Sequence, residues 1–147
     1  LARLGRADRK GAPDTFDAAG YTAMLARIRA AAGTDETVYA PAFRREIEEP
    51  IAGAIAVRPE HRLVITEGNY LLCDGAWSGV RPLLDACWYV GIRVEDRIQR
   101  LIARHMSFGR SRQAATEWVL RSDEANARLI ETMRARADRQ VTWPPPD

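Results

Sequence analysis

The clearest strand in the sequence is Leu63-Val64-Ile65-Thr66, which runs directly into Glu67-Gly68-Asn69. The run is apolar, largely β-branched and too short for a helix, so it predicts a strand. A continuous apolar run is typical of a parallel strand buried on both faces. The polar break at its carboxyl end places Glu67 and Asn69 where a metal ion or substrate can be reached, although a turn carboxylate would look the same.

Shorter elements alternate on both sides of this strand. The residue pattern predicts helices at 20–32, 94–106 and 111–137, short strands at 37–40, 54–57, 86–90 and 140–143, and a polar connection at 41–53. Strands separated by helices indicate a layered α/β fold. Ligands of such folds bind beyond the carboxyl ends of the strands, so we expect the site near 39–43, 67–70 and the segment after Val90.

Composition and net charge limit the classes of function that the sequence supports. The 147 residues suit one domain, and 46% hydrophobic and 29% charged residues are an ordinary globular balance. A net charge of +2 gives no support to a nucleic-acid partner. Lys10 is the single lysine, so nearly all basic residues are arginines, whose guanidinium groups bind carboxylates and phosphates in bidentate fashion.

The sequence also gives expectations about compartment. It holds no apolar run of about 18 residues, so we expect no membrane partner. Its first residues lack a secretory hydrophobic region. Cys73 and Cys87 are too few for a disulfide framework or a zinc site. We therefore expect both cysteines to be buried and reduced, and the protein to be cytoplasmic.

A basic segment follows the last central strand. Arg97, Arg100 and Arg104 are spaced so that one helical face can present all three. His105 and Arg110 flank a glycine break in the same segment. Such a cluster can close over a polyphosphate and neutralise its charge, but a solvated helix face would show the same spacing.

The loop at residues 10–17 is a further candidate. Asp14 and Asp17 lie three residues apart around Phe16. The two acids could hold a hydroxylated substrate. Alternatively, Asp17 could cap the helix that follows it closely.

Five ordered blocks of the sequence resemble a known family, namely 9–17, 39–45, 67–72, 100–105 and 123–130. The series is similar to the P-loop small-molecule kinases of the uridine kinase and pantothenate kinase branch, including bacterial fructose transport system kinases. The similarity extends from about residue 8 to residue 142. It implies a three-layer α/β/α parallel sheet. It also implies ATP- and Mg²⁺-dependent phosphorylation of a hydroxyl on a sugar, nucleoside or pantothenate-like molecule.

The resemblance further implies roles for single residues. Glu67 matches the acid after the Walker B-like strand, an indirect Mg²⁺ ligand, and is catalytic together with Arg100 and Arg104. A lid at about 97–112 closes over the nucleotide, and Asp138 lies near the adenine. The implied nucleotide-contacting lid residues are Arg100, Arg104, His105 and Arg110. The implied substrate-binding residues are Asp14, Phe16, Asp17, Tyr39, Phe43, Arg44, Asn69 and Tyr70.

One departure from the family pattern is clear. The sequence contains no G-x-x-x-x-G-K-[ST] loop, and Lys10 cannot replace it because Gly11-Ala12 follows. In the family this loop lies upstream, together with the first strand and an aspartate that serves as the catalytic base. We therefore expect residues 1–147 to form a single domain that is the later part of a kinase and is inactive alone. A non-catalytic regulatory or binding protein of kinase ancestry is the alternative, and the sequence leaves a homodimer open.

Overall fold

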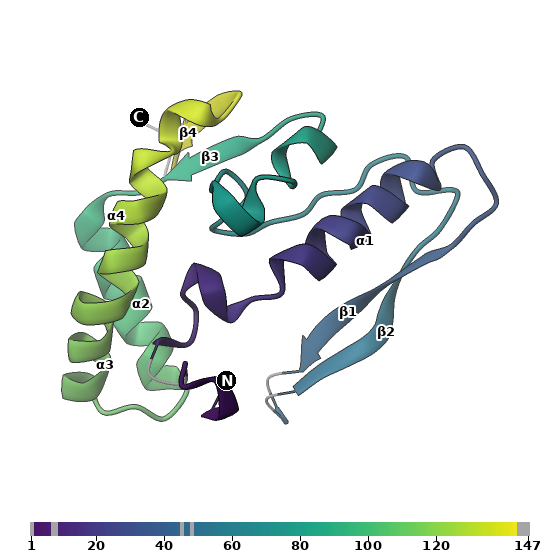
Figure 1. Cartoon of the computed structure of the whole chain (residues 1–147). Coiled ribbons are helices and arrows are strands. Elements are labelled where there is room, and N and C mark those ends of the chain that lie inside the picture. Colours follow the sequence, from purple (N-terminus) through teal and green to yellow (C-terminus); the bar gives the residue numbers. More distant parts are fainter. Residues whose placement is uncertain (1, 7–8, 45, 48, 144–147) are drawn as a thin grey trace. The chain divides into compact units, whose positions relative to one another are not determined.

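The computed structural model describes residues 2–6, 9–44, 46–47 and 49–143. The chain folds into two compact units (Figure 1). One unit is Asp17–Leu83, and the other combines Leu1–Phe16 with Leu84–Asp147. Within the described ranges, no helix is both long and apolar enough to cross a membrane.

The unit Asp17–Leu83 is built on helix α1, Ala18–Ala30. The helix begins two residues before its predicted start at residue 20, and the Asp17 carboxylate caps it by accepting a hydrogen bond from the Gly20 amide at 2.8 Å. Trp77 lies in the core of this unit, with its ring centroid 5.9 Å from Tyr21 and 5.7 Å from Tyr70. Short 3₁₀ helices at Gly75–Trp77 and Arg81–Leu83 follow in the same unit.

A long hairpin follows α1 in the same unit. Strand β1, Val38–Arg44, pairs antiparallel with β2, Glu49–Val57. The prediction that the first strand ends at residue 40 is wrong, as is the predicted polar connection at 41–53. The register shifts between Ala40 and Ala42, so Pro41, which has no N–H to donate, is left out of the ladder. Both strands are edge strands, where proline is tolerated.

The segment Leu63–Thr66 differs most from its prediction. It is not a strand in the structure, and Leu63 and Ile65 are 75% and 82% exposed. A buried parallel strand needs a paired neighbour on each side. Among the described residues, β1 and β2 pair with each other, and so do β3 and β4, so this segment has no partner. The end of the segment is held against α1, because Tyr21 Oη and Thr66 Oγ1 share a hydrogen bond of 2.5 Å.

The second unit contains the predicted parallel pair. Strand β3, Trp88–Gly91, lies parallel to β4, Arg139–Thr142, with Trp88 opposite Arg139. The two strands were predicted in these places. The expectation that the first of them is buried is wrong, because Trp88 and Val90 are exposed on this two-stranded sheet.

Helices connect these two strands. They are α2 (Val94–Ser107), α3 (Arg112–Trp118), a π-helical segment (Val119–Asp123), α4 (Glu124–Thr132) and a 3₁₀ turn (Arg134–Arg136). Both predicted helices are confirmed, the second in several pieces. Ala115, Val119 and Met133 form the apolar core of this unit with Cys87. Cys73, in the other unit, and Cys87 are both buried and free of disulfides, as expected.

Candidate functional site

Several basic side chains of the predicted lid, which consists of most of α2 and the loop after it, are already engaged. Arg97 of α2 forms a bidentate ion pair with Glu124 of α4: Nη2 donates to both carboxylate oxygens at 2.7 and 2.9 Å, and Nε donates to Oε1 at 3.1 Å. Glu124 is 9% exposed. Charge-assisted bidentate bonds of this kind have a defined geometry, so they fix how the two helices meet.

The carboxyl end of α2 is held in the same way. His105 Nε2 lies 2.9 Å from Asp123 Oδ2, and its ring packs edge-on against Trp118 at 6.5 Å. The Arg110 guanidinium lies over the Trp118 ring, 4.3 Å from its centroid. Two of the predicted nucleotide-contacting residues, His105 and Arg110, therefore hold this region against α3 and the π-helical segment Val119–Asp123.

Arg100 and Arg104 differ from their neighbours. Both are exposed, and neither guanidinium group makes a hydrogen bond or ion pair with another described residue. They lie four residues apart and share a face of α2. Two guanidinium groups without internal partners are thus presented side by side to an incoming anion.

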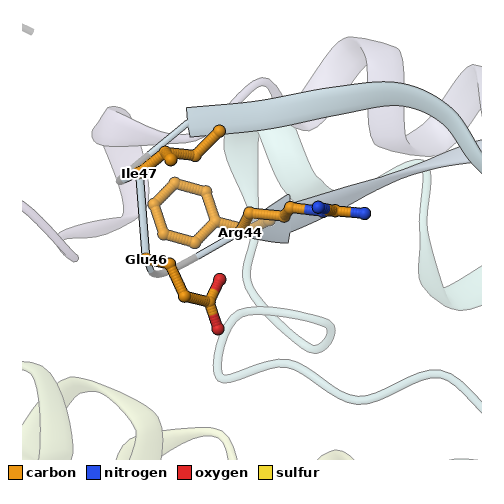
Figure 2. A pocket seen from close by; sticks show the side chains of 4 residues that line it. Arg44, Glu46 and Ile47 are labelled. Atoms are coloured by element: carbon orange, nitrogen blue, oxygen red, sulfur yellow. The ribbon is translucent and has the colours of Figure 1, made fainter.

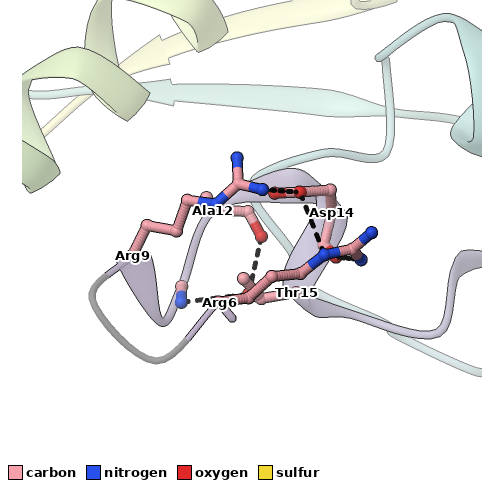
Figure 3. A network of polar contacts seen from close by, with 6 residues as sticks. Arg6, Arg9, Ala12, Asp14 and Thr15 are labelled. Atoms are coloured by element: carbon pink, nitrogen blue, oxygen red, sulfur yellow. Dashed lines mark hydrogen bonds and ion pairs between the residues drawn. The ribbon is translucent and has the colours of Figure 1, made fainter. Parts of the chain in front are cut away.

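The N-terminal loop holds Asp14 in an arginine network (Figure 3). Arg9 Nη2 lies 2.7 Å from Asp14 Oδ2, and Arg6 Nε lies 3.6 Å from the same oxygen. Arg6 also donates to the Asp14 backbone carbonyl at 2.5 Å. A substrate hydroxyl would therefore compete with two guanidinium groups for this carboxylate.

The rest of that loop is shaped by its own hydrogen bonds. The Thr15 hydroxyl donates to the Ala12 carbonyl at 2.7 Å and accepts from the Gly11 amide at 3.1 Å. Phe16 is exposed. Asp17 belongs to the other unit and caps α1, which is the structural alternative raised from the sequence.

The hairpin carries the predicted aromatic substrate residues. Tyr39 and Phe43 are both exposed on β1. A shallow hollow at the hairpin tip is lined by Phe43, Arg44, Glu46 and Ile47 (Figure 2). The Arg44 side chain points away from Glu46 and Ile47 in that view, so its guanidinium faces outward.

Glu67 and Asn69 are exposed at the end of the extended segment. Glu67 makes no hydrogen bond or ion pair with another described residue. Tyr70 is different, because its ring is 3% exposed and packs on Trp77 in the core. The prediction that Tyr70 faces a substrate cleft is not matched by this buried position, which follows from the aromatic cluster around Trp77.

The described residues contain no group of three or more histidine, cysteine or acidic side chains that could hold a metal ion. Mg²⁺ in phosphoryl-transfer sites is commonly held by one or two carboxylates together with substrate phosphates and water. An exposed, unpaired carboxylate such as Glu67 fits that pattern. The chain's own residues therefore suit an ion that arrives with a nucleotide.

The predicted residues are divided between the two units. Glu67, Asn69, Asp17 and the hairpin residues lie in one unit, and Asp14, Phe16 and the lid lie in the other. That Glu67 shares a cleft with Tyr39 or Arg44 stays a prediction. Sequence reasoning missed the anchors of α2, which are Asp123, Glu124 and Trp118, although the acidic pair was visible in the block at 123–130.

Comparison with curated proteins places this geometry in a family, although no family model matches the chain. An ATP-dependent kinase-like protein, notR', of Aspergillus versicolor is 36% identical over 123 residues, which is 81% of this chain and 72% of the relative. A proposed uridine kinase of Schizosaccharomyces pombe is 32% identical over 125 residues, covering 83% of this chain and 52% of the relative.

Solved structures agree. A proposed fructose transport system kinase of Silicibacter matches with a TM-score of 0.82 and 39% identity, over 98% of this chain and 68% of that protein. A P-loop containing kinase of Saccharomyces cerevisiae matches in fold, with a TM-score of 0.79 at 20% identity, over 95% of this chain and 50% of that protein. The predicted α/β fold class of the P-loop kinase type is thereby confirmed. The chain belongs to the P-loop kinases of the uridine kinase and pantothenate kinase-like branch.

Proposed function

We propose that this chain forms the acceptor side and the lid of an ATP- and Mg²⁺-dependent kinase that phosphorylates a hydroxyl of a small molecule. The family supports phosphotransfer as the class of reaction. The names of the relatives support a sugar, nucleoside or pantothenate-like acceptor.

The observation that carries this proposal is the state of the charges on α2. Arg97 forms an ion pair with Glu124 and the His105 ring contacts Asp123, whereas the Arg100 and Arg104 side chains have no partner among the described residues. An arginine pair kept free beside an anchored face is suited to bind the oxygens of a polyphosphate.

The chemistry expected of these residues is electrostatic. Phosphoryl transfer spreads negative charge over the transferred group, and catalysis consists mostly of positioning and charge stabilisation. Arg100 and Arg104 would bind that charge, and Glu67 would help to hold the bound Mg²⁺ through its water shell. The ion supplies charge neutralisation between the phosphates.

The acceptor side has an aromatic and a polar component. Tyr39 and Phe43 are exposed apolar surfaces against which a ring or an alkyl chain can pack. The exposed Asn69 amide can donate to and accept from hydroxyl groups. This combination suits a hydroxylated molecule with an apolar face.

The test is an acceptor panel with ATP and Mg²⁺, run on the chain extended upstream by a segment with a Walker A loop. We expect ADP release that depends on one class of acceptor among sugars, nucleosides and pantothenate. Nucleotide binding with no turnover of any acceptor would contradict the proposal and favour a regulatory protein of kinase ancestry.

A further inference from the structure

Two adjacent acids, Asp123 and Glu124, hold α2 at two points. Asp123 contacts His105 at 2.9 Å, and Glu124 contacts Arg97 at 2.7 Å. Arg97 and His105 are eight residues apart, which is about 12 Å along an α-helix. Asp123 and Glu124, which are adjacent in the chain, thus anchor both ends of the α2 segment that carries the free arginines, Arg100 and Arg104.

The pair formed by Glu124 is set apart from the other ion pairs by burial. Glu124 is the charged side chain that is buried in the described part of the chain. Arg93–Asp96, by contrast, joins residues of one helical turn and is largely exposed on its arginine. A buried carboxylate needs its partner in a fixed place, whereas an exposed pair can shift with little cost. The contact with Arg97 is therefore a constraint on where α2 lies.

The π-helical segment Val119–Asp123 explains how one helix can offer both apolar and acidic side chains to α2. A π turn accommodates one residue more than an α turn, which rotates everything after it by about 100° about the axis. Ala115 and Val119 are fully buried before and at the start of this segment. Asp123 ends it and Glu124 begins α4, and both face α2.

The anchors also set the rotation of α2. At about 100° per residue, Arg97 and His105 lie about 80° apart on the helix surface. Arg104 and Arg100 lie about 20° and 60° beyond Arg97 on the other side. Apolar contacts are non-directional and tolerate sliding, but a bidentate ion pair and a hydrogen bond on one side of a helix do not. The direction in which the free arginines point is thus defined by the two acids.

We propose that Asp123 and Glu124 are positioning residues for Arg100 and Arg104, acting through His105 and Arg97. The inference rests on the proposed function, since it assumes that α2 meets the phosphates of a nucleotide. Neither acid contacts the phosphate itself. Their loss should weaken phosphate binding and turnover although every lid arginine is still present.

The first test measures binding of inorganic tripolyphosphate by the 147-residue chain in calorimetry. Glu124→Gln and Asp123→Asn each remove a negative charge, so simple electrostatics predicts tighter anion binding. Positioning predicts the opposite sign, a loss of about 5- to 10-fold. Glu131→Gln on α4 is the matched control, because it makes the same charge change in an exposed pair with Arg134. Binding that tightens equally in all three variants would overturn the proposal.

The second test measures amide hydrogen exchange along α2 in the same chain. In Glu124→Gln and Asp123→Asn we expect the amides at 98–107 to exchange about 10-fold faster, with α1 unchanged. Unaltered exchange in α2 in both variants would overturn the proposal. Asp123→Asn removes the more exposed of the two pairs, so it keeps the test valid if Glu124→Gln does not fold.

The third test uses the enzyme extended upstream. Glu124→Gln should lower kcat about 10-fold with the acceptor KM within about 2-fold of the parent value. Exchanging the partners, Arg97→Glu with Glu124→Arg, should recover part of that loss. No recovery, with α2 protected normally, would contradict the assignment. If no acceptor turns over at all, the proposed function fails, whereas the tripolyphosphate and exchange results still decide the role of the two acids.

Discussion

The helices α2 to α4 and the segment at 63–69 both carry side chains that need partners, and they differ in where the partners lie. In the helical region, Arg97 and His105 meet acids, and the apolar side chains of Ala115 and Val119 are buried. In the segment, Leu63 and Ile65 remain exposed and no strand pairs with them among the described residues. A helix satisfies its own backbone, whereas a strand depends on neighbours.

The largest loss of stability should follow from removing the ion pair between Arg97 and Glu124. Arg97→Ala leaves the buried Glu124 carboxylate without its bidentate partner. We expect a loss of about 2–3 kcal/mol in the free energy of unfolding, at the lower end for a buried pair because Arg97 is partly exposed. Denaturant unfolding followed by circular dichroism measures it. The control is Arg93→Ala, whose exposed pair with Asp96 should contribute less than about 1 kcal/mol. Equal losses in the two variants would contradict the claim that the buried pair contributes more to stability than the exposed pair.

A second prediction compares apolar residues of the unit Asp17–Leu83. Val80 is fully buried, so Val80→Ala should cost about 1–2 kcal/mol. Ile65→Ser should change stability by about 0.5 kcal/mol or less, because the side chain is already in water. Thermal unfolding of both variants measures the two changes in stability. A large loss from Ile65→Ser would show that the segment is buried in solution.

The smallest effect concerns Tyr89 and Glu131. Burial and the hydrogen bond from Tyr89 Oη to Glu131 Oε2, 2.5 Å long, raise the pKa of Tyr89. The hydrogen bonds from Tyr89 and Arg134 lower the pKa of Glu131. The Tyr89 contribution to stability is therefore present below about pH 10 and lost as pH rises through the folded pKa. The Glu131 contribution is present above about pH 4.5 and lost as pH falls through its folded pKa.

A titration checks this pair. Glu131→Gln should bring the pKa of Tyr89 down toward its ordinary value, as followed by ring resonances in nuclear magnetic resonance. Because Glu131 is exposed, the change in stability should stay below about 1 kcal/mol. A Tyr89 pKa that does not move would mean that the hydrogen bond is not formed in solution.

The comparison also explains what could be predicted from the sequence. Helices α1 and α2 and the strands β3 and β4 were predicted because their signals are local: apolar residues at helical spacing and short apolar runs. The strand at 63–66 was not found, because an apolar run predicts the residues of a buried strand but not the presence of its neighbours. The predicted strands of the hairpin are shorter than β1 and β2, because proline is rarely found inside a strand. The register shift in the structure shows how Pro41 is accommodated.

In the candidate site, too, local features could be predicted and tertiary contacts could not. The basic character of the lid was visible from spacing, and so was the exposed acid Glu67. The division between anchored and unpaired basic side chains was not, because it depends on Asp123, Glu124 and Trp118, which are brought to α2 by tertiary packing. Burial of Tyr70 likewise depends on Trp77, seven residues further along.

The central claim is that Arg104 and its neighbour Arg100 bind the charge of a transferred phosphoryl group. The most direct measurement is steady-state ADP release with the preferred acceptor, for the chain extended by a Walker A segment and its Arg104→Ala variant. The account predicts a kcat about 100-fold lower in the variant, with a smaller effect on acceptor KM. It also predicts full activity in the control Arg128→Ala, an exposed arginine of α4, and no turnover by the 147-residue chain alone. An unchanged kcat in Arg104→Ala, or ATP-dependent turnover by the 147-residue chain, would contradict it.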